Sequence, residues 1–375
     1  MSWRRAVVAP DKFKGSLTAV EAAQAIERGI GRGAPSLEDV RLIPMADGGE
    51  GTVDAFLAGG ARRIVRTVRG PLEQRVQAAF ALEGTTAIVE MSAASGFALA
   101  GARRDPLRAT TFGTGELVRA ALDTGATSIV VGIGGSATND GGGGFLQALG
   151  ARLLDESGEE LAPGGAALAR LAKIDLRDLD PRIARTRFEV AADVDNPLCG
   201  PNGASAIFGP QKGASPSQVR LLDDALSHYA DVAAQTLGVD RRNEAGAGAA
   251  GGLGFALIAF AGATLRPGVQ IIAKLRGLDV ALVGADAVFT GEGSIDAQTL
   301  AGKTVAGVAQ LAQKAGVRTI VAFGGRVDPI AALTLERLGV KSVAIAEATL
   351  PTAEAMRDAA ILLERAAESA ARFSG

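Results

Sequence analysis

Short apolar runs alternate with amphipathic stretches at the N-terminal end of this 375-residue chain. Thr18 and Glu21, three residues apart, form the pattern of a helix-capping box at the start of one such stretch. The patterns predict strands at 5–9, 40–43 and 64–68 and helices at 18–30 and 49–57. Strands that alternate with helices in this way indicate βαβ units and a parallel sheet.

The same alternation returns in the last third of the chain. There the patterns predict strands at 286–290, 317–323 and 342–346, and helices at 304–315, 329–338 and 354–372. The middle differs, because 76–82 and 86–90 read as a hairpin and long loops are expected at 92–113 and 193–216. Two similar ends around a dissimilar middle predict an α/β protein with a discontinuous domain, residues 1–66 plus 282–375, interrupted by an inserted domain, residues 67–281.

Composition narrows the chemistry. The net charge of −2 gives no basic footprint for nucleic acid. One cysteine, Cys199, and one histidine, His228, make cysteine-based zinc sites and histidine-based triads implausible, so acid–base work falls to Asp, Glu or Lys. Residues 246–265 carry no charge, but their first half is glycine and alanine, which predicts a glycine-rich loop opening a short buried helix. A soluble cytoplasmic protein without a membrane partner is expected.

The strongest candidate for ligand binding is the stretch 132–151, GIGGSATNDGGGGFLQALGA. It joins an apolar run to a helical pattern through glycines mixed with short polar side chains. Such a loop can bind phosphate through free backbone N–H groups and the positive end of the helix. A glycine-rich turn without a ligand is the alternative, and the amide of Asn139 and the carboxylate of Asp140 weigh against it.

Other polar, glycine-containing segments follow predicted strands, where ligands of open parallel sheets bind. They are APDKFKGS (9–16), PMADGGEGT (44–52), DVDNPLCGPNGAS (193–205) and TGEGSIDAQTLAGKT (290–304), with FGPQKGAS (208–215) as a further loop. Carboxylates suit Mg²⁺, and lysines neutralise phosphate, so the combination favours phosphoryl transfer. A non-catalytic binder of a phosphorylated or carboxylated ligand stays open. An NAD-dependent dehydrogenase is disfavoured, because Gly246–Gly251 does not follow a strand.

These segments, in their order along the chain, resemble the type 1 glycerate kinases. The motifs that carry the resemblance also include VEMSAASG, TTFGTGELVRAAL, GIGGSATNDGG and GAGAAGGLGFAL, and together they span nearly the whole chain. The resemblance implies a Rossmann-like domain interrupted by a second α/β domain, with the active site in the cleft between them. It implies ATP- and Mg²⁺-dependent phosphorylation of D-glycerate to 2-phosphoglycerate, with 3-phosphoglycerate as the alternative product. A homo-oligomer is left open.

Roles follow for individual residues as hypotheses. Asp193 and Asp195 stand one residue apart after a strand, so we expect one to bind Mg²⁺ and the other to act as the base, with Lys12 also catalytic. The residues expected to bind the nucleotide are Gly134, Gly135, Ser136, Asn139, Asp140, Glu292, Asp296 and Lys303. The residues expected to bind the substrate are Asp11, Lys14, Ser16, Asp47, Asn196 and Lys212.

Overall fold

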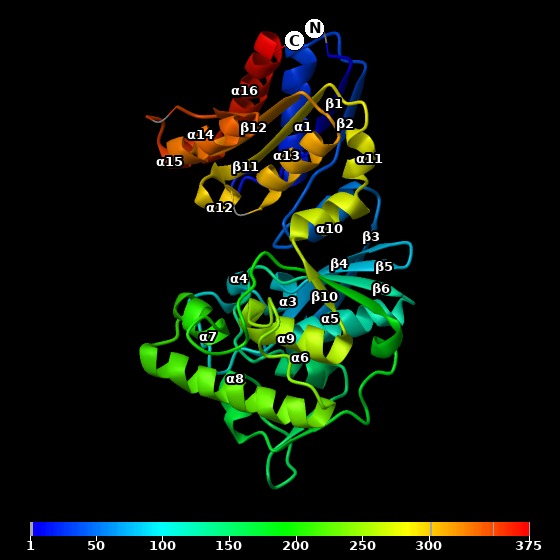
Figure 1. Cartoon of the computed structure of the whole chain (residues 1–375), viewed down its shortest axis with the longest axis vertical. Helices are drawn as coiled ribbons and strands as arrows, with labels where there is room; N and C mark the ends of the chain where they lie inside the picture. Colours follow the sequence, from blue (N-terminus) through cyan, green and yellow to red (C-terminus); the bar gives the residue numbers. More distant parts are fainter. Residues whose placement is uncertain (1–2, 301, 348, 375) are drawn as a thin grey trace. The chain divides into compact units, whose positions relative to one another are not determined.

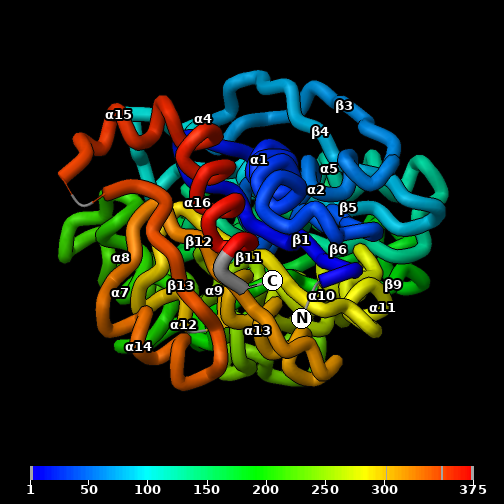
Figure 2. The backbone as a smooth tube through the Cα atoms, turned by 90° about the horizontal axis from the view of Figure 1, so that it is seen from above, coloured from blue at the N-terminus to red at the C-terminus, as the bar shows by residue number. Residues whose placement is uncertain are grey.

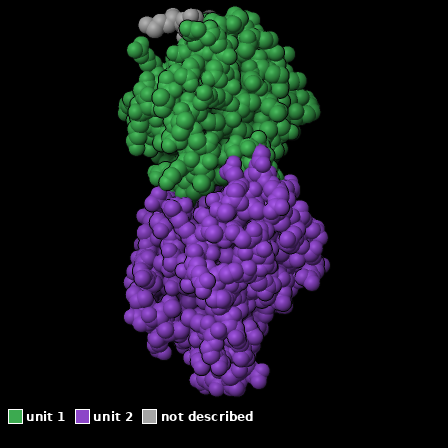
Figure 3. All heavy atoms as spheres, turned by 90° about the vertical axis from the view of Figure 1, so that its right-hand side faces the viewer, with its two compact units in different colours: residues 1–47, 54–59, 267–375 green, residues 48–53, 60–266 purple. Residues whose placement is uncertain are grey.

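The fold is taken from a computed structural model, which describes residues 3–300, 302–347 and 349–374. The chain divides into two compact units (Figure 3). Unit 1 comprises Met1–Asp47, Asp54–Gly59 and Pro267–Gly375, and unit 2 comprises Gly48–Val53 and Gly60–Arg266. In this division unit 2 resumes at Gly60 and unit 1 resumes at Pro267. The domain boundaries expected from the sequence, at 67 and 282, stay a prediction.

Unit 1 is built on a five-stranded sheet in the order β13-β12-β11-β1-β2, and all its neighbouring strands are parallel. The strands are β1 (Arg5–Val8), β2 (Asp39–Leu42), β11 (Ala287–Ile295), β12 (Thr319–Val327) and β13 (Val340–Ala344). β1 and the first residues of the central strand β11 are almost fully buried, which explains their continuous apolar runs, because helices cover both faces of a parallel sheet. The predicted strands in these regions are confirmed.

The helices of unit 1 lie on both faces of this sheet. They are α1 (Ala19–Gly33), α2 (Thr52–Ala58, whose first two residues belong to unit 2), α10 (Gly268–Leu275), α11 (Leu278–Leu282), α12 (Ala297–Leu300), α13 (Thr304–Lys314), α14 (Pro329–Arg337), α15 (Thr352–Arg357) and α16 (Ala359–Ser374). Figure 2 shows α1 and α16 side by side on one face and α13 on the other. The capping box of Thr18 and Glu21 is confirmed at the start of α1.

The helix expected over 354–372 is two helices instead of one. The chain bends at Asp358, which has φ −99° and ψ 10° and ends α15 before α16 begins. Helical spacing alone did not reveal this bend, because alanine-rich sequence on both sides favours helix.

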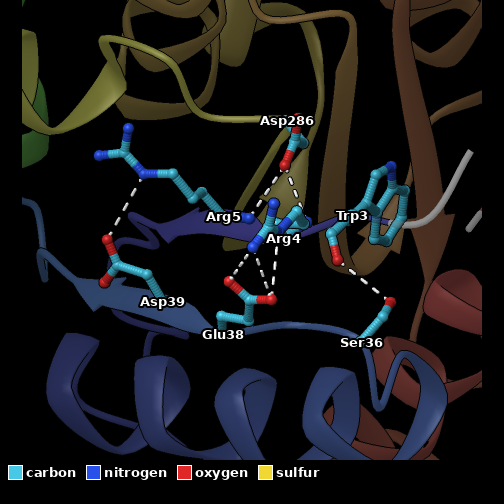
Figure 4. A network of polar contacts seen from close by, with 7 residues as sticks. All are labelled: Trp3, Arg4, Arg5, Ser36, Glu38, Asp39 and Asp286. Carbon is cyan, nitrogen blue, oxygen red and sulfur yellow. Dashed lines mark hydrogen bonds and ion pairs between the residues drawn. The ribbon is translucent and has the colours of Figure 1, made fainter.

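A polar network fixes the amino end of β1 between its two neighbours (Figure 4). The backbone N–H groups of Arg4 and Arg5 donate to one carboxylate oxygen of Asp286 at 2.8 and 2.9 Å. Arg4 also forms an ion pair with Glu38, 2.8 Å, next to β2. These contacts lie at the amino ends of the strands. The candidate site residues of unit 1 lie at the opposite, carboxyl ends.

Unit 2 contains a six-stranded mixed sheet in the order β10-β9-β6-β5-β4-β3 and a separate pair, β7-β8. The strands are β3 (Arg62–Arg69), β4 (Arg75–Glu83), β5 (Thr86–Glu90), β6 (Ser128–Gly132), β7 (Arg152–Leu154), β8 (Lys173–Asp175), β9 (Arg187–Ala191) and β10 (Thr264–Arg266). The predicted hairpin of β4 and β5 is confirmed. Because β3 pairs with β4 over its whole length, it belongs to this sheet, and residue 66, after which the sequence predicts a domain boundary, lies within β3.

The helices of unit 2 are mostly short (Figure 1). They are α3 (Ser92–Ser95), α4 (Phe97–Ala100), α5 (Phe112–Asp123), α6 (Gly143–Ala148), α7 (Ala204–Phe208), α8 (Pro216–Leu237), α9 (Ala249–Ala261) and the 3₁₀ turns η1 (Gly165–Arg170), η2 (Ile183–Arg185) and η3 (Pro210–Lys212). The segments expected as loops at 92–113 and 193–216 thus contain helical turns. Among the described residues, no helix is both long and apolar enough to cross a membrane.

Candidate active site

Asp11 is a buried acid three residues after the end of β1. Its side chain is only 7% exposed, and its carboxylate accepts hydrogen bonds from the Thr304 hydroxyl, 2.5 Å, and from the Lys12 backbone N–H, 2.7 Å. Burial and the nearby negative charge of Asp47 raise the pKa of Asp11 to about 6, although the Thr304 hydrogen bond works in the opposite direction. Asp11 therefore exchanges its proton close to neutral pH.

Glu292 is a second acid of the same kind, on β11. One of its oxygens accepts a hydrogen bond from the hydroxyl of Thr299 at 2.7 Å. Burial raises the pKa of Glu292 to about 7, and the negative charge of Asp11 adds to the effect. Two carboxylates that influence each other and titrate near neutral pH are an arrangement typical of functional sites.

The topology explains why these two acids meet. β1 and β11 are neighbours in the sheet, but the chain leaves β1 through α1 on one face and leaves β11 towards α13 on the other. Such a change of direction opens a crevice at the carboxyl ends of the two strands, where α/β proteins bind ligands. Asp11 and Glu292 lie at this position in unit 1.

The other predicted residues of unit 1 surround the same strand ends. Lys12 and Asp47 both interact electrostatically with Asp11. Lys303 caps the start of α13 with its backbone and donates from Nζ to the Gln298 side chain at 2.9 Å. Asp296 accepts from the backbone N–H of Gln298 at 2.8 Å, next to α12. The exposed Lys14 and half-buried Ser16 lie in the turn that follows Phe13, where the Ser16 hydroxyl donates to the Phe13 carbonyl.

In unit 2, the carboxylate of Asp140 occupies the start of α6. It accepts hydrogen bonds from the backbone N–H and hydroxyl of Thr111, 2.7 and 2.8 Å, and from the backbone N–H groups of Gly142 and Gly144, 3.2 and 3.3 Å. Asp140 is 1% exposed, and burial raises its pKa despite these donors. The protein's own carboxylate thus occupies this helix start, and phosphate binding by the loop stays a prediction.

Lys212 lies beneath the glycine-rich loop. It is 2% exposed, and its ammonium donates to the backbone carbonyl of Thr138 at 2.6 Å. Burial lowers the pKa of Lys212 to about 7, although the charge of Asp140 favours the protonated form. The hydrogen-bond partner of Lys212 is thus a backbone carbonyl of the loop, and its contact with the substrate stays a prediction.

Asn139 is also buried, and its side-chain amide donates to the Ser205 hydroxyl at 2.8 Å. Its carbonyl oxygen and the hydroxyl of Tyr229 are buried without a hydrogen-bond partner among the described residues. The outer part of the loop differs, because Gly135 is exposed, Gly134 is half-buried, and only Ser136 is buried, at 6% exposure. Of the loop residues expected to bind a nucleotide, the two glycines are therefore the accessible ones.

Asp193 and Asp195 are exposed in the segment between β9 and α7. Asn196 stabilises the local structure of the same segment. Its side-chain Nδ2 donates to the Asn202 backbone carbonyl at 2.9 Å, and its backbone carbonyl accepts from the Gly248 N–H at 2.8 Å. Within the described residues, no three or more Asp, Glu, His or Cys side chains are grouped to hold a metal ion. Mg²⁺ commonly uses only one or two protein carboxylates plus water and phosphate oxygens, so this pair fits that donor chemistry.

Sequence reasoning missed the hydroxyl groups that orient the acids. Thr304, Thr299 and Thr111 are each buried and each donates to a carboxylate that the sequence had singled out. Thr304 and Thr299 lie in the quoted segment 290–304, but a threonine in a loop has no pattern that distinguishes a carboxylate donor from an ordinary turn residue.

The protein is thus of the α/β class, and its carboxylate pair lies at the switch point of a parallel sheet, where such proteins bind their ligands. The glycerate kinase family model matches residues 6–374. The chain therefore belongs to the glycerate kinase family.

Individual relatives agree with this assignment. The chain is 47% identical over 370 residues to a glycerate kinase of Bacillus subtilis, covering 97% of this chain and 96% of the relative. It is 50% identical over 329 residues to the glycerate 2-kinase of Escherichia coli, covering 86% of each. A crystal structure described as glycerate kinase 2 from Salmonella typhimurium LT2 matches with a TM-score of 0.87 at 44% identity, covering 99% of this chain and 98% of that one.

Proposed function

We propose that this protein transfers the γ-phosphoryl group of ATP to the 2-hydroxyl of D-glycerate, giving 2-phosphoglycerate and ADP. Family membership and the name of the 50% identical Escherichia coli relative support the reaction and the 2-position. The observation that carries the proposal is the pair Asp11 and Glu292, whose pKa values of about 6 and about 7 suit acid–base chemistry near neutral pH.

In the proposed reaction, the hydroxyl oxygen of glycerate forms a bond to the γ-phosphorus. The bond between that phosphorus and the oxygen bridging to the β-phosphate breaks, and ADP leaves. The hydroxyl proton needs an acceptor, and Glu292 is our preferred candidate, because Thr299 orients one of its oxygens and its pKa is close to 7. Asp193 or Asp195, the bases expected from the sequence, are the competing assignment.

We propose Asp193 and Asp195 as ligands of Mg²⁺, which when bound to ATP neutralises phosphate charge. Their exposure is compatible with an ion that keeps several water molecules. Lys12, Lys14 and Lys303 supply positive charge close to the acid pair of unit 1, and the accessible Gly134 and Gly135 offer backbone N–H groups in unit 2. That substrates bind between the two units stays a prediction.

The reaction is tested by incubating the protein with Mg-ATP and D-glycerate and following ADP release. Coupling to enolase then identifies the product, because enolase consumes 2-phosphoglycerate directly, whereas 3-phosphoglycerate must first be isomerised. Absence of glycerate-dependent ADP release would contradict the kinase proposal and favour a non-catalytic binder. ADP release without an enolase signal would support the kinase activity but indicate 3-phosphoglycerate as the product.

A further inference from the structure

A cavity of about 430 Å³ lies in unit 1 beyond the carboxyl ends of β11, β12 and β13. The turn after β1 and the helix α15 complete its walls. Its volume falls in the range of small-molecule sites, about 300 to 1,000 Å³. Asp11 and Glu292 do not line this cavity, so the proposed acid–base chemistry does not explain its presence.

Two glycines give the cavity a stretch of bare backbone. Gly293 follows Glu292 directly on β11, and Gly325 lies on the neighbouring β12. A Cβ atom on Gly293 would come within 2.9 Å of the Lys14 backbone nitrogen, and one on Gly325 within 2.6 Å of the Gly293 carbonyl oxygen. Glycine is therefore needed at both positions, because a side chain there would collide with neighbouring backbone, and the two residues add no side chain to the cavity.

Apolar side chains form the rest of the inner wall. Phe13, Ile345 and Ala359 are buried at 2%, 8% and 2% exposure, and the flexible thioether of Met356 borders the cavity from α15. A three-carbon hydroxy acid such as glycerate has no apolar surface to match this wall. A heteroaromatic ring does have such a surface, and burying it against aliphatic and aromatic carbon is favourable.

Charged side chains line the same cavity. Lys14 and Arg326 are cationic, and Glu347, which follows β13, is an exposed carboxylate. The Arg326 guanidinium also donates to the hydroxyl of Thr352, so it ties β12 to the first turn of α15. Cations suit phosphate groups, and an acid beside an apolar wall suits the hydroxyls of a ribose, as in dinucleotide sites of parallel sheets.

We propose that this cavity binds the adenosine portion of ATP, with Glu347 accepting hydrogen bonds from the ribose hydroxyls and Lys14 contacting the phosphates. The inference rests on the proposed function, because it takes ATP as the phosphoryl donor. It assigns the nucleoside to unit 1, whereas the sequence had pointed to the glycine-rich loop of unit 2 for much of the nucleotide contact. The chain order supports it: Gly293 on the cavity wall is the immediate neighbour of Glu292 in the acid pair.

The test fills the cavity from α15. Ala355 lines it and Ala353, on the same helix, is exposed and does not line it, so Ala355→Phe and Ala353→Phe are matched variants. We expect Ala355→Phe to raise KM for ATP and Kd for ADP about tenfold or more, the equivalent of about 1.4 kcal/mol, with KM for D-glycerate unchanged. Calorimetric titration with ADP needs no turnover, so it tests the cavity even if glycerate is not the substrate.

A second pair of variants tests the ribose contact. In the wild type, KM for 2′-deoxyATP should exceed KM for ATP, and Glu347→Ala should bring the ratio of the two closer to one. Glu354→Ala on α15, which does not line the cavity, should leave this ratio at the wild-type value. Equal ADP affinity in Ala355→Phe and Ala353→Phe would overturn the adenosine assignment while leaving the kinase proposal intact. If Ala355→Phe does not fold, an unchanged nucleotide ratio in Glu347→Ala overturns the assignment, and a narrowed ratio supports it.

Discussion

The hydroxyl of Thr304 at the start of α13 donates a 2.5 Å hydrogen bond to the carboxylate of Asp11 after β1, across 293 residues of sequence. Asp11 is buried and its pKa is raised to about 6, so this donor is one of the groups that keep its ionised form accessible at neutral pH. The contact links the first and the last of the three segments of unit 1, at the position where the order of strands along the sheet reverses.

Replacing Thr304 by Val should raise the pKa of Asp11 further, because a hydrogen bond to its charged form is lost. Such bonds contribute about 1.5–3 kcal/mol, so we expect the acid limb of the kcat/KM profile to move to higher pH by about one to two units and activity at pH 7 to fall about two- to fifteenfold. Thr304→Ser keeps the hydroxyl and should restore the wild-type profile. An unshifted acid limb in Thr304→Val would show that Asp11 does not control activity.

Glu292→Gln tests the proposed proton acceptor. A glutamine cannot take up the hydroxyl proton, so we expect kcat to fall by about 100-fold or more. The pKa of Glu292 is about 7, so wild-type activity should rise with pH through the range from about 6 to 8, and this rise should be lost in the variant. The control is Glu354→Gln, an exposed acid on α15. A pH profile in Glu292→Gln identical to wild type would transfer the role to Asp193 or Asp195.

Asp193→Asn and Asp195→Asn test the Mg²⁺ pair. Removing one negative charge from a two-carboxylate site should weaken the metal, so we expect half-saturation to need about tenfold more Mg²⁺ at fixed ATP. Asp224→Asn, an exposed acid on α8, is the control. Near-wild-type turnover and Mg²⁺ dependence in both variants would remove these residues from the site.

Lys212→Met tests the buried ammonium beneath the glycine-rich loop. The folded-state pKa of Lys212 is about 7, below its ordinary 10.5, so between these values the unfolded chain binds a proton that the folded protein has lost. The free energy of unfolding therefore contains a contribution that rises with pH in this window, by up to about 1.4 kcal/mol per pH unit. Urea unfolding at pH 7, 8 and 9 should show this rise relative to Lys212→Met, whereas Lys274→Met, at an exposed position of α10, should parallel the wild type. A parallel Lys212→Met curve would contradict the lowered pKa.

Gly29→Ala tests the close packing of α1 on α16, which Arg28 and Arg32 reinforce through ion pairs with Glu364. A Cβ at Gly29 would lie 2.3 Å from the Glu364 carbonyl oxygen, so we expect a loss of about 1–3 kcal/mol in unfolding free energy. Gly31 is on the same helix, and a Cβ added there would have no neighbouring atom within 4 Å, so Gly31→Ala should instead stabilise by up to about 1 kcal/mol. Equal effects of the two substitutions, measured by denaturant unfolding, would contradict the tight helix contact.

The strands and helices of unit 1 could be predicted from the sequence because they follow local patterns. Buried parallel strands appear as apolar runs, and Thr18 with Glu21 marks a helix start within four residues. The strand β3 was also predicted, yet its sheet was not, because pairing with β4 depends on contacts that no single-strand pattern encodes. The domain boundary predicted after residue 66 therefore lies inside a paired strand.

The candidate chemical groups are visible in the sequence: acids, lysines and glycine-rich loops at strand ends, with a single cysteine and a single histidine, in motifs of the glycerate kinase family. Which of these groups lie together depends on the folded chain. It put Asp11 beside Glu292, gave Asp140 and Lys212 buried partners within the protein, and left Gly135 exposed. The physical reason is that burial and neighbouring charge set the protonation and accessibility of a side chain, and both depend on residues far away in the chain.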